Sequence, residues 1–154
     1  MKSCKHYWDE ACFIGQFDLE TVSRVTERFL ELRGEFLEGG LVYREFLSLK
    51  PIGVHPQSSL PLTLEYRVFV LGGQILKVGN YWPEGDYQDH ERPPEDWLQT
   101  VIGKIQSPFF SLDVALDTDE RWWVIEVGDG QVSGLNSALS AEEFYPALFT
   151  ATRS

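Results

Sequence analysis

The sequence is poor in cysteine and in basic residues and has no long apolar run, and each shortage excludes a class of protein. Only two of its 154 residues are cysteines, Cys4 and Cys12, which argues for a reduced, cytosolic protein rather than a disulfide framework. The net charge of −11 argues against a broad grip on a nucleic-acid backbone, which requires a basic face. No run approaches the length of a membrane span, and the first residues have no apolar signal core. We therefore expect a cytoplasmic protein that binds neither membranes nor nucleic acid, while a small basic nucleotide pocket stays compatible with the charge.

The chain does contain enough apolar and aromatic material for one folded domain. Hydrophobic residues make up 43% of it, with 5 Trp and 10 Phe, which is typical of a globular protein. Apolar periodicity, glycine pairs and helix caps predict an α+β fold, with an antiparallel sheet and flanking helices. We expect helices from a cap at Asp18 to Gly34, from Pro93 or Pro94 to about Gln106, and after Ser140; strands at 41–49, 63–71, 74–81 and on both sides of a turn at 117–120; and loops at 50–60 and 82–94.

The last two strands form an acidic hairpin. Each carries one carboxylate among apolar neighbours, Asp113 and Glu126. A loop at 118–121 places the two directly opposite each other, and a loop shifted by one residue on each side leaves them diagonal on the same face. Like charges opposed in a sheet repel, so we expect a compensating divalent cation, and removal of one acid to stabilise the ligand-free protein slightly. Mg²⁺ favours one or two carboxylates with phosphate and water. A solvated sheet face that happens to carry two acids is an equal alternative.

Two further clusters contain cations. Arg44 and Glu45 interrupt the apolar run 41–49, which suits a flat heterocycle such as adenine or, alternatively, an exposed edge strand with a salt bridge. Arg67 and Lys77 lie within apolar strands, where a forked guanidinium and a mobile ammonium suit phosphate oxygens. A strict two-residue turn puts these two cations on opposite faces, whereas a three-residue loop or a bulge brings them together; the sequence leaves both arrangements open.

A glycine-rich segment follows the acidic hairpin. Gly128, Gly130 and Gly134 permit tight backbone turns near a ligand, and Asp129 offers a third carboxylate to a cation site. The alternative is a flexible loop between the last strand and the last helix. The spacing matches neither the dinucleotide fingerprint nor the P-loop.

Three motifs in this order resemble the C-terminal half of an ATP-grasp domain. The run 65–76, Glu-Tyr-Arg-Val-Phe-Val-Leu-Gly-Gly-Gln-Ile-Leu, resembles its acidic-x-Arg-x-x-Val-x-Gly-Gly strand pair. The runs 112–115 and 124–135 resemble its metal-binding strands, and 42–47 resembles the adenine hinge before them. The sequence is most similar to a divergent clade of uncharacterised bacterial and phage ATP-grasp proteins.

The resemblance implies roles for particular residues. It implies that ATP and Mg²⁺ are bound, with Asp113 and Glu126 as metal ligands. Arg67 would contact phosphates and act in catalysis, and we expect Lys77, from its own place in an apolar strand, to act with it. The adenine site would be lined by Arg44, Glu45, Phe46 and Leu47. The family's third ligand is usually an asparagine two residues after the glutamate, where this chain has Gly128, and either Asp129 or water is expected to take its place.

The resemblance also predicts the activity. It implies a Mg-ATP-dependent ligase that joins a small-molecule or peptide carboxylate to an amine or a thiol through an acyl-phosphate. A degenerate, non-catalytic nucleotide-binding or interaction module is the alternative, and a metal-dependent phosphohydrolase is a third option. We expect residues 1–154 to form a single ATP-grasp-like domain without the N-terminal part of the usual fold, which a homo-oligomer or a partner chain would supply.

Overall fold

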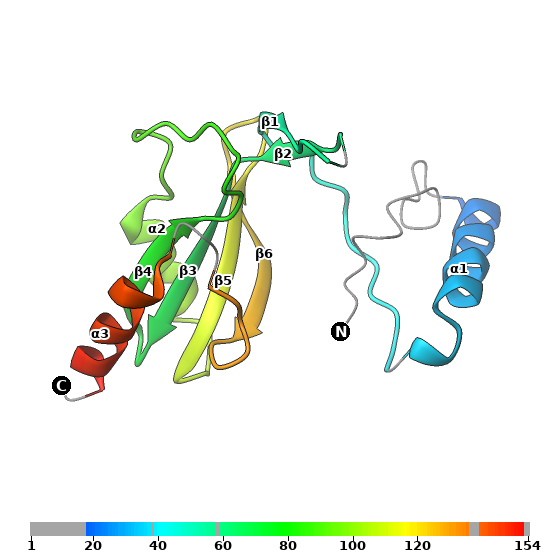
Figure 1. The fold of residues 1–154 in the computed structure, drawn as a ribbon. Helices are drawn as coiled ribbons and strands as arrows, with labels where there is room; N and C mark the ends of the chain where they lie inside the picture. Colours follow the sequence, from blue (N-terminus) through cyan, green and yellow to red (C-terminus); the bar gives the residue numbers. More distant parts are fainter. Residues whose placement is uncertain (1–17, 38, 58, 136–138, 153–154) are drawn as a thin grey trace. The chain divides into compact units, whose positions relative to one another are not determined.

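The computed structural model describes residues 18–37, 39–57, 59–135 and 139–152, and Figure 1 shows its ribbon. The chain separates into two compact units, Met1–Glu45 and Phe46–Ser154. Cys4 and Cys12 lie outside the described residues. In the described part of the chain, no helix is both long and apolar enough to cross a lipid bilayer.

The first unit contains the helix that its caps predict. Helix α1 spans Leu19–Arg33. The Asp18 carboxylate accepts a hydrogen bond from the backbone N–H of Thr21 at 2.8 Å, which satisfies a donor that the first helical turn leaves unpaired. Gly34 ends the helix with φ at 48°, a conformation that a residue without a Cβ adopts readily. A short 3-10 turn, η2 (Gly34–Phe36), follows.

The prediction of a strand at 41–49 is wrong. The run has no regular structure apart from an isolated antiparallel bridge between Leu49 and Asp117. Val42 and Phe46 are 83% and 68% exposed. Apolar alternation predicts a strand only where a sheet face buries the apolar side chains, and these two side chains are exposed.

The prediction of a loop at 50–60 is also wrong for part of this segment. It contains β1 (Pro51–Val54), which pairs with β2 (Pro61–Thr63) in a two-stranded antiparallel sheet. Pro51 is the first residue of its strand, where a missing N–H is tolerated. The register shifts between Pro51 and Gly53. Proline and glycine are typical of loops, which explains why the sequence predicts a loop here.

A four-stranded antiparallel sheet forms the centre of the second unit, in the order β4-β3-β5-β6. Its strands are Glu65–Leu71 (β3), Gln74–Asn80 (β4), Phe109–Leu116 (β5) and Trp122–Asp129 (β6). Gly72 and Gly73, with φ at 56° and 80°, form the predicted turn between β3 and β4. The α-helices and antiparallel sheets of the described residues confirm the predicted α+β class.

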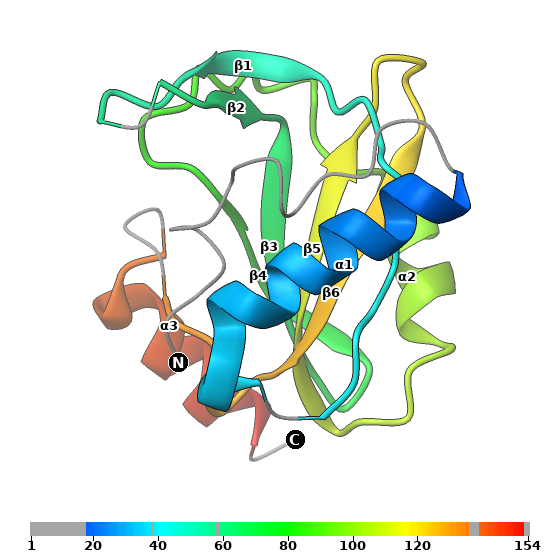
Figure 2. The same cartoon turned by 90° about the vertical axis from the view of Figure 1, so that its right-hand side faces the viewer.

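The two faces of this sheet are covered differently. On one face, Val68 and Leu112 are fully buried in an apolar cluster with Leu98 of α2 (Glu95–Ile102). On the other face, α3 (Ala141–Ala151) covers one end, where the rings of Phe69 and Phe144 pack with centroids 4.7 Å apart. Figure 2 shows the two helices on opposite sides of the sheet. The remaining part of the α3 face carries polar side chains.

Both of these helices begin where predicted. Pro94 precedes α2 as its N-cap residue. Ser140 precedes α3, and its Oγ accepts a hydrogen bond from the Glu143 backbone N–H at 3.2 Å, as the capping pattern predicts. Helix α2 ends at Ile102 and not near Gln106, because Gly103 is a poor helix former.

Candidate functional site

The polar part of the α3 face is centred on an ion pair between Arg67 of β3 and Asp113 of β5, which are paired across the sheet. Arg67 Nε donates to Asp113 Oδ1 at 2.7 Å, and Arg67 Nη2 donates to Oδ2 at 2.6 Å. This two-pronged geometry is the strongest match between a guanidinium and a carboxylate. Arg67 Nη1 also donates to the carbonyl of Gly134 at 3.1 Å. The guanidinium lies over the Tyr81 ring, 5.1 Å from its centroid, so contacts on several sides fix its orientation.

Burial strengthens this ion pair. The side chains of Arg67 and Asp113 are 18% and 4% exposed, so water screens their attraction only weakly. The hydrogen bond to Asp113 raises the pKa of Arg67, against burial, which lowers it. Burial raises the pKa of the Tyr81 phenol, and a tyrosine is neutral at physiological pH even at its ordinary pKa of about 10. The centre of the site is therefore a permanently charged guanidinium held against a carboxylate.

Glu126 lies directly opposite Asp113, one of the two arrangements that the sequence allows. The loop between the two strands is neither of the two predicted ones. The pair closest to the turn is Leu116 with Trp122, and Ile125 is an extra residue in β6. Such a bulge shifts the strand by one residue and here returns both acids to the same face. Glu126 is exposed on the edge strand β6.

Arg67 supplies positive charge that the two opposed acids require. The sequence alone assigns this compensation to a divalent cation. In the structure, the guanidinium neutralises Asp113, and attraction to Glu126 contributes to its raised pKa. Removing Asp113 would therefore leave a largely buried arginine without its partner, so the expected stabilisation of the ligand-free protein is replaced by an expected loss.

The structure decides the question that the sequence left open about Lys77. Leu76 is an extra residue in β4, so Lys77 lies opposite Phe69 and shares a face with Arg67. Its ammonium is 3.6 Å from a carboxylate oxygen of Glu143 in α3. Both cations therefore belong to one sheet face, with Lys77 paired to the helix that covers its end.

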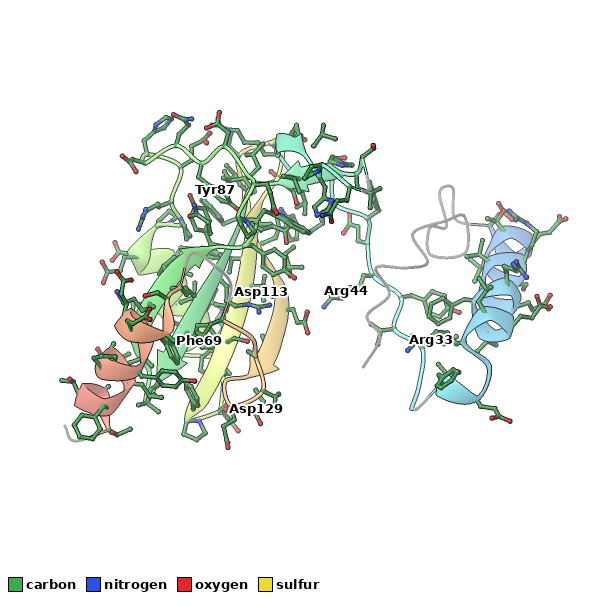
Figure 3. The ribbon with its side chains drawn as sticks, in the orientation of Figure 1. Arg33, Arg44, Phe69, Tyr87, Asp113 and Asp129 are labelled. Atoms are coloured by element: carbon green, nitrogen blue, oxygen red, sulfur yellow. The ribbon has the colours of Figure 1, made fainter. Side chains whose placement is uncertain are left out.

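The structure does not bring Asp129 to the two opposed acids. Asp129 pairs with Phe110, whose side chain belongs to the apolar face. It lies three positions after Glu126 along the strand, and an odd offset directs the two side chains to opposite faces. Its Oδ1 accepts a hydrogen bond from the Gln131 N–H at 2.8 Å, and Figure 3 shows it at the end of β6, away from Asp113. Among the described residues, no three His, Cys, Asp or Glu side chains form a group that could hold a metal ion.

The run 44–47, which the resemblance assigns to adenine, is divided between the two units. Arg44 and Glu45 belong to the first unit, and Phe46 and Leu47 belong to the second. Leu47 is half-buried and the other three are exposed. Contact of these residues with adenine stays a prediction.

Sequence reasoning missed two hydroxyl groups beside the acids. Ser111 precedes Asp113 by two positions on β5, so the two side chains share a face. Ser111 lies opposite Gly128 of β6. Its Oγ is 2.6 Å from the Oγ of Ser133. The two-residue spacing of Ser111 and Asp113 is visible in the sequence, whereas the contact with Ser133 depends on how the chain turns after β6.

The chemistry of these groups fits Mg²⁺ and phosphate. A carboxylate offers about four lone-pair positions, so two bonds from Arg67 leave Asp113 able to accept further partners. Mg²⁺ favours one or two carboxylates together with phosphate and water, and a guanidinium suits phosphate oxygens. Asp113 and Glu126 would hold the metal, and Arg67 would hold the phosphates.

A comparison with known families identifies a match to nearly the whole chain. A family model described as ATP-grasp domain, R2K clade family 3, matches residues 1–148. The matched span includes Arg67, Asp113 and Glu126. No curated protein matches the sequence.

Proposed function

The chain belongs to the ATP-grasp domain family, R2K clade family 3, and from this premise we propose that it is a Mg-ATP-dependent ligase that joins a carboxylate to an amine or a thiol. ATP-dependent ligation is the function of the family at its coarsest level, and ATP-grasp domains generally bind ATP and Mg²⁺. We further propose a small-molecule or peptide carboxylate as the substrate.

One observation carries the proposal: Arg67, Asp113 and Glu126 meet on one sheet face within the span that matches the family. Transfer of a phosphoryl group spreads negative charge over its oxygens, and catalysis consists largely of positioning and charge stabilisation. A fixed guanidinium meets that charge, and adjacent carboxylates suit Mg²⁺, which neutralises phosphate charge when bound.

The reaction has two steps. A carboxylate oxygen attacks the γ-phosphorus of ATP, the bond to the β-phosphate oxygen breaks, and ADP leaves an acyl-phosphate behind. The amine or thiol then attacks the acyl carbon and releases its proton to solvent, and inorganic phosphate leaves with the bonding electrons. Arg67 would stabilise the transferring phosphoryl group, and Lys77 would add a second, mobile cation once it leaves Glu143.

Mg-ATP is expected to raise the melting temperature of the protein. A ligand that binds only the native state at about 100 times its Kd adds about 2.7 kcal/mol, which corresponds to a shift of roughly 5–10 °C at this size. Glu126→Gln should reduce the part of the shift that requires Mg²⁺, while Glu142→Gln, an exposed acid of α3, serves as the matched control. No shift with millimolar nucleotide, with or without metal, would contradict the proposal.

Turnover is expected to depend on Arg67 more strongly than nucleotide binding does. Arg67→Lys keeps the charge but loses the planar fork, and interactions made mainly in the transition state affect rate more than affinity. We expect about a 100-fold loss of kcat with a much smaller change in ATP affinity. ADP release is followed with ATP, Mg²⁺ and pooled amino acids or short peptides, and Arg28→Lys at an exposed helix position is the control.

The parent protein distinguishes the activities. ADP release that requires a carboxylate and an amine or thiol supports the ligase. A flat trace from a sample that binds Mg-ATP would indicate a non-catalytic nucleotide-binding module. ADP release that proceeds at the same rate without either substrate would indicate a phosphohydrolase.

A further inference from the structure

Ser111 lies among the groups that would hold the metal. Ser111 and Asp113 alternate along β5, and they lie opposite Gly128 and Glu126 of β6. These four residues occupy adjacent positions on one face of the sheet. Ser111 is only 3% exposed, so the strand and its neighbours limit where its hydroxyl can point.

The hydrogen bonds around Ser111 determine what its oxygen can accept. Ser133 Oγ donates to the carbonyl of Asp129 at 2.8 Å, which uses its single proton. In the 2.6 Å contact between the two hydroxyls, Ser111 is therefore the donor. Its proton is committed to Ser133, and lone pairs of its oxygen stay available as acceptors.

Gly128 leaves the space in which the two hydroxyls meet. A Cβ at Gly128 would lie 2.9 Å from the Oγ of Ser111 and 3.0 Å from the Oγ of Ser133. Both distances are shorter than ordinary van der Waals contact, so any side chain at this position would displace the pair. The absence of a side chain at Gly128 thus permits the Ser111–Ser133 pair beside the acids.

We infer that Ser111 Oγ is a third protein oxygen for the Mg²⁺ held at Asp113 and Glu126, with Ser133 fixing the direction of its proton. An oxygen that has donated its proton elsewhere repels phosphate oxygens, which are also acceptors, but attracts a hard cation, which takes oxygen ligands. This inference rests on the proposed function, and it makes Ser111 a metal ligand and Ser133 a positioning residue.

The first test is a Mg²⁺ titration at fixed ATP, followed by the melting temperature. Ser111→Ala should raise the Mg²⁺ midpoint about tenfold, since loss of a supporting group at a metal site typically weakens affinity by 10–100-fold. The shift caused by ATP without metal should stay at the parent value. Ser133 keeps its bond to Asp129 in this variant, so no donor is orphaned. Ser107→Ala, which removes a half-buried hydroxyl bonded to Phe109, is the matched control.

The second test exchanges the ligand atom. Ser111→Cys places sulfur at the same position, and soft metals prefer thiolate whereas Mg²⁺ prefers oxygen. We expect this variant to lose affinity for Mg²⁺ about as much as Ser111→Ala does, and to recover a metal-dependent ATP shift with Cd²⁺. Parent protein with Cd²⁺ measures any contribution from the native cysteines. A merely structural role for Ser111 would not change the order of preference between the two metals.

The outcomes separate this inference from the proposed function. A parent protein without a Mg-dependent ATP shift overturns both. A parent with that shift and a Ser111→Ala variant with the parent's Mg²⁺ midpoint overturns the inference and leaves the ligase proposal standing. If Ser111→Ala melts too low to be titrated, Ser133→Ala takes its place: a raised Mg²⁺ midpoint supports the pair, and an unchanged midpoint overturns it.

Discussion

Arg67→Met should destabilise the ligand-free protein by about 3 kcal/mol, because breaking a buried ion pair by removing one partner leaves the other charge uncompensated. Asp113 would lose both bonds of the guanidinium while its side chain is only 4% exposed. The free energy of unfolding, measured by urea denaturation at pH 7, gives the effect directly.

A double-mutant cycle shows whether the loss belongs to the pair. Asp113→Asn alone should cost about 2 kcal/mol, less than Arg67→Met, because Arg67 keeps its contacts with Gly134 and Tyr81 and loses only part of its partner. The double variant should be more stable than the sum of the single losses predicts, by about 2 kcal/mol of coupling.

An exposed pair on the same sheet face provides the control. Lys77 and Glu143 are 36% and 64% exposed and 3.6 Å apart, and such pairs contribute about 0–1 kcal/mol. Lys77→Met should therefore leave the free energy of unfolding nearly unchanged. Additive effects of Arg67→Met and Asp113→Asn would mean that the two side chains do not depend on each other in the folded protein.

The elements that the sequence predicted well are those with strong local signals. The caps at Asp18 and Ser140 satisfy backbone groups within three residues, and the glycines at 72–73 adopt the positive φ angles of a tight turn. These signals are local, so no knowledge of the tertiary structure is needed. The run 41–49 failed because its alternation is local while burial is not. Apolar periodicity carries no information about whether a partner strand is present.

The sequence singled out Arg67, Asp113 and Glu126 but not the contacts among them, and it missed Ser111 and Ser133. The opposition of Asp113 and Glu126 was one of two arrangements that the sequence allows. The bulge at Ile125 that produces it, and the bulge at Leu76 that moves Lys77, have no local signature. The sequence likewise gave no reason to pair Arg67 with Asp113, because the two lie 46 residues apart and meet only through the β3–β5 register.

Asp117, at the turn between β5 and β6, is the other group whose removal should have a large effect. Its side chain is 5% exposed and accepts hydrogen bonds from the backbone N–H groups of Asp119 and Arg121 at 2.9 and 2.8 Å. It also accepts from Arg121 Nε at 2.9 Å and from Trp123 Nε1 at 2.7 Å. Burial raises the pKa of Asp117, but the bonds from the Arg121 N–H, the Trp123 indole, the Arg121 guanidinium and the Asp119 N–H outweigh it and lower the pKa to about 2.

Stability should therefore depend on pH through this carboxylate. Its folded pKa lies below that of an unfolded aspartate, about 3.9, so Asp117 stabilises the fold above about pH 4 and loses this effect as the pH falls toward 2. Asp117→Asn removes the charge and places an amide NH2 group, a donor, against N–H groups that need an acceptor. We therefore expect the melting temperature at pH 7 to fall by about 5 °C. Asp119→Asn, at a side chain that is 71% exposed, should change it little. Between pH 5 and pH 2 the parent should lose stability faster than Asp117→Asn, so the melting temperatures of the two proteins should converge as the pH falls. A constant difference in melting temperature over that range would show that the charge of Asp117 does not stabilise the turn.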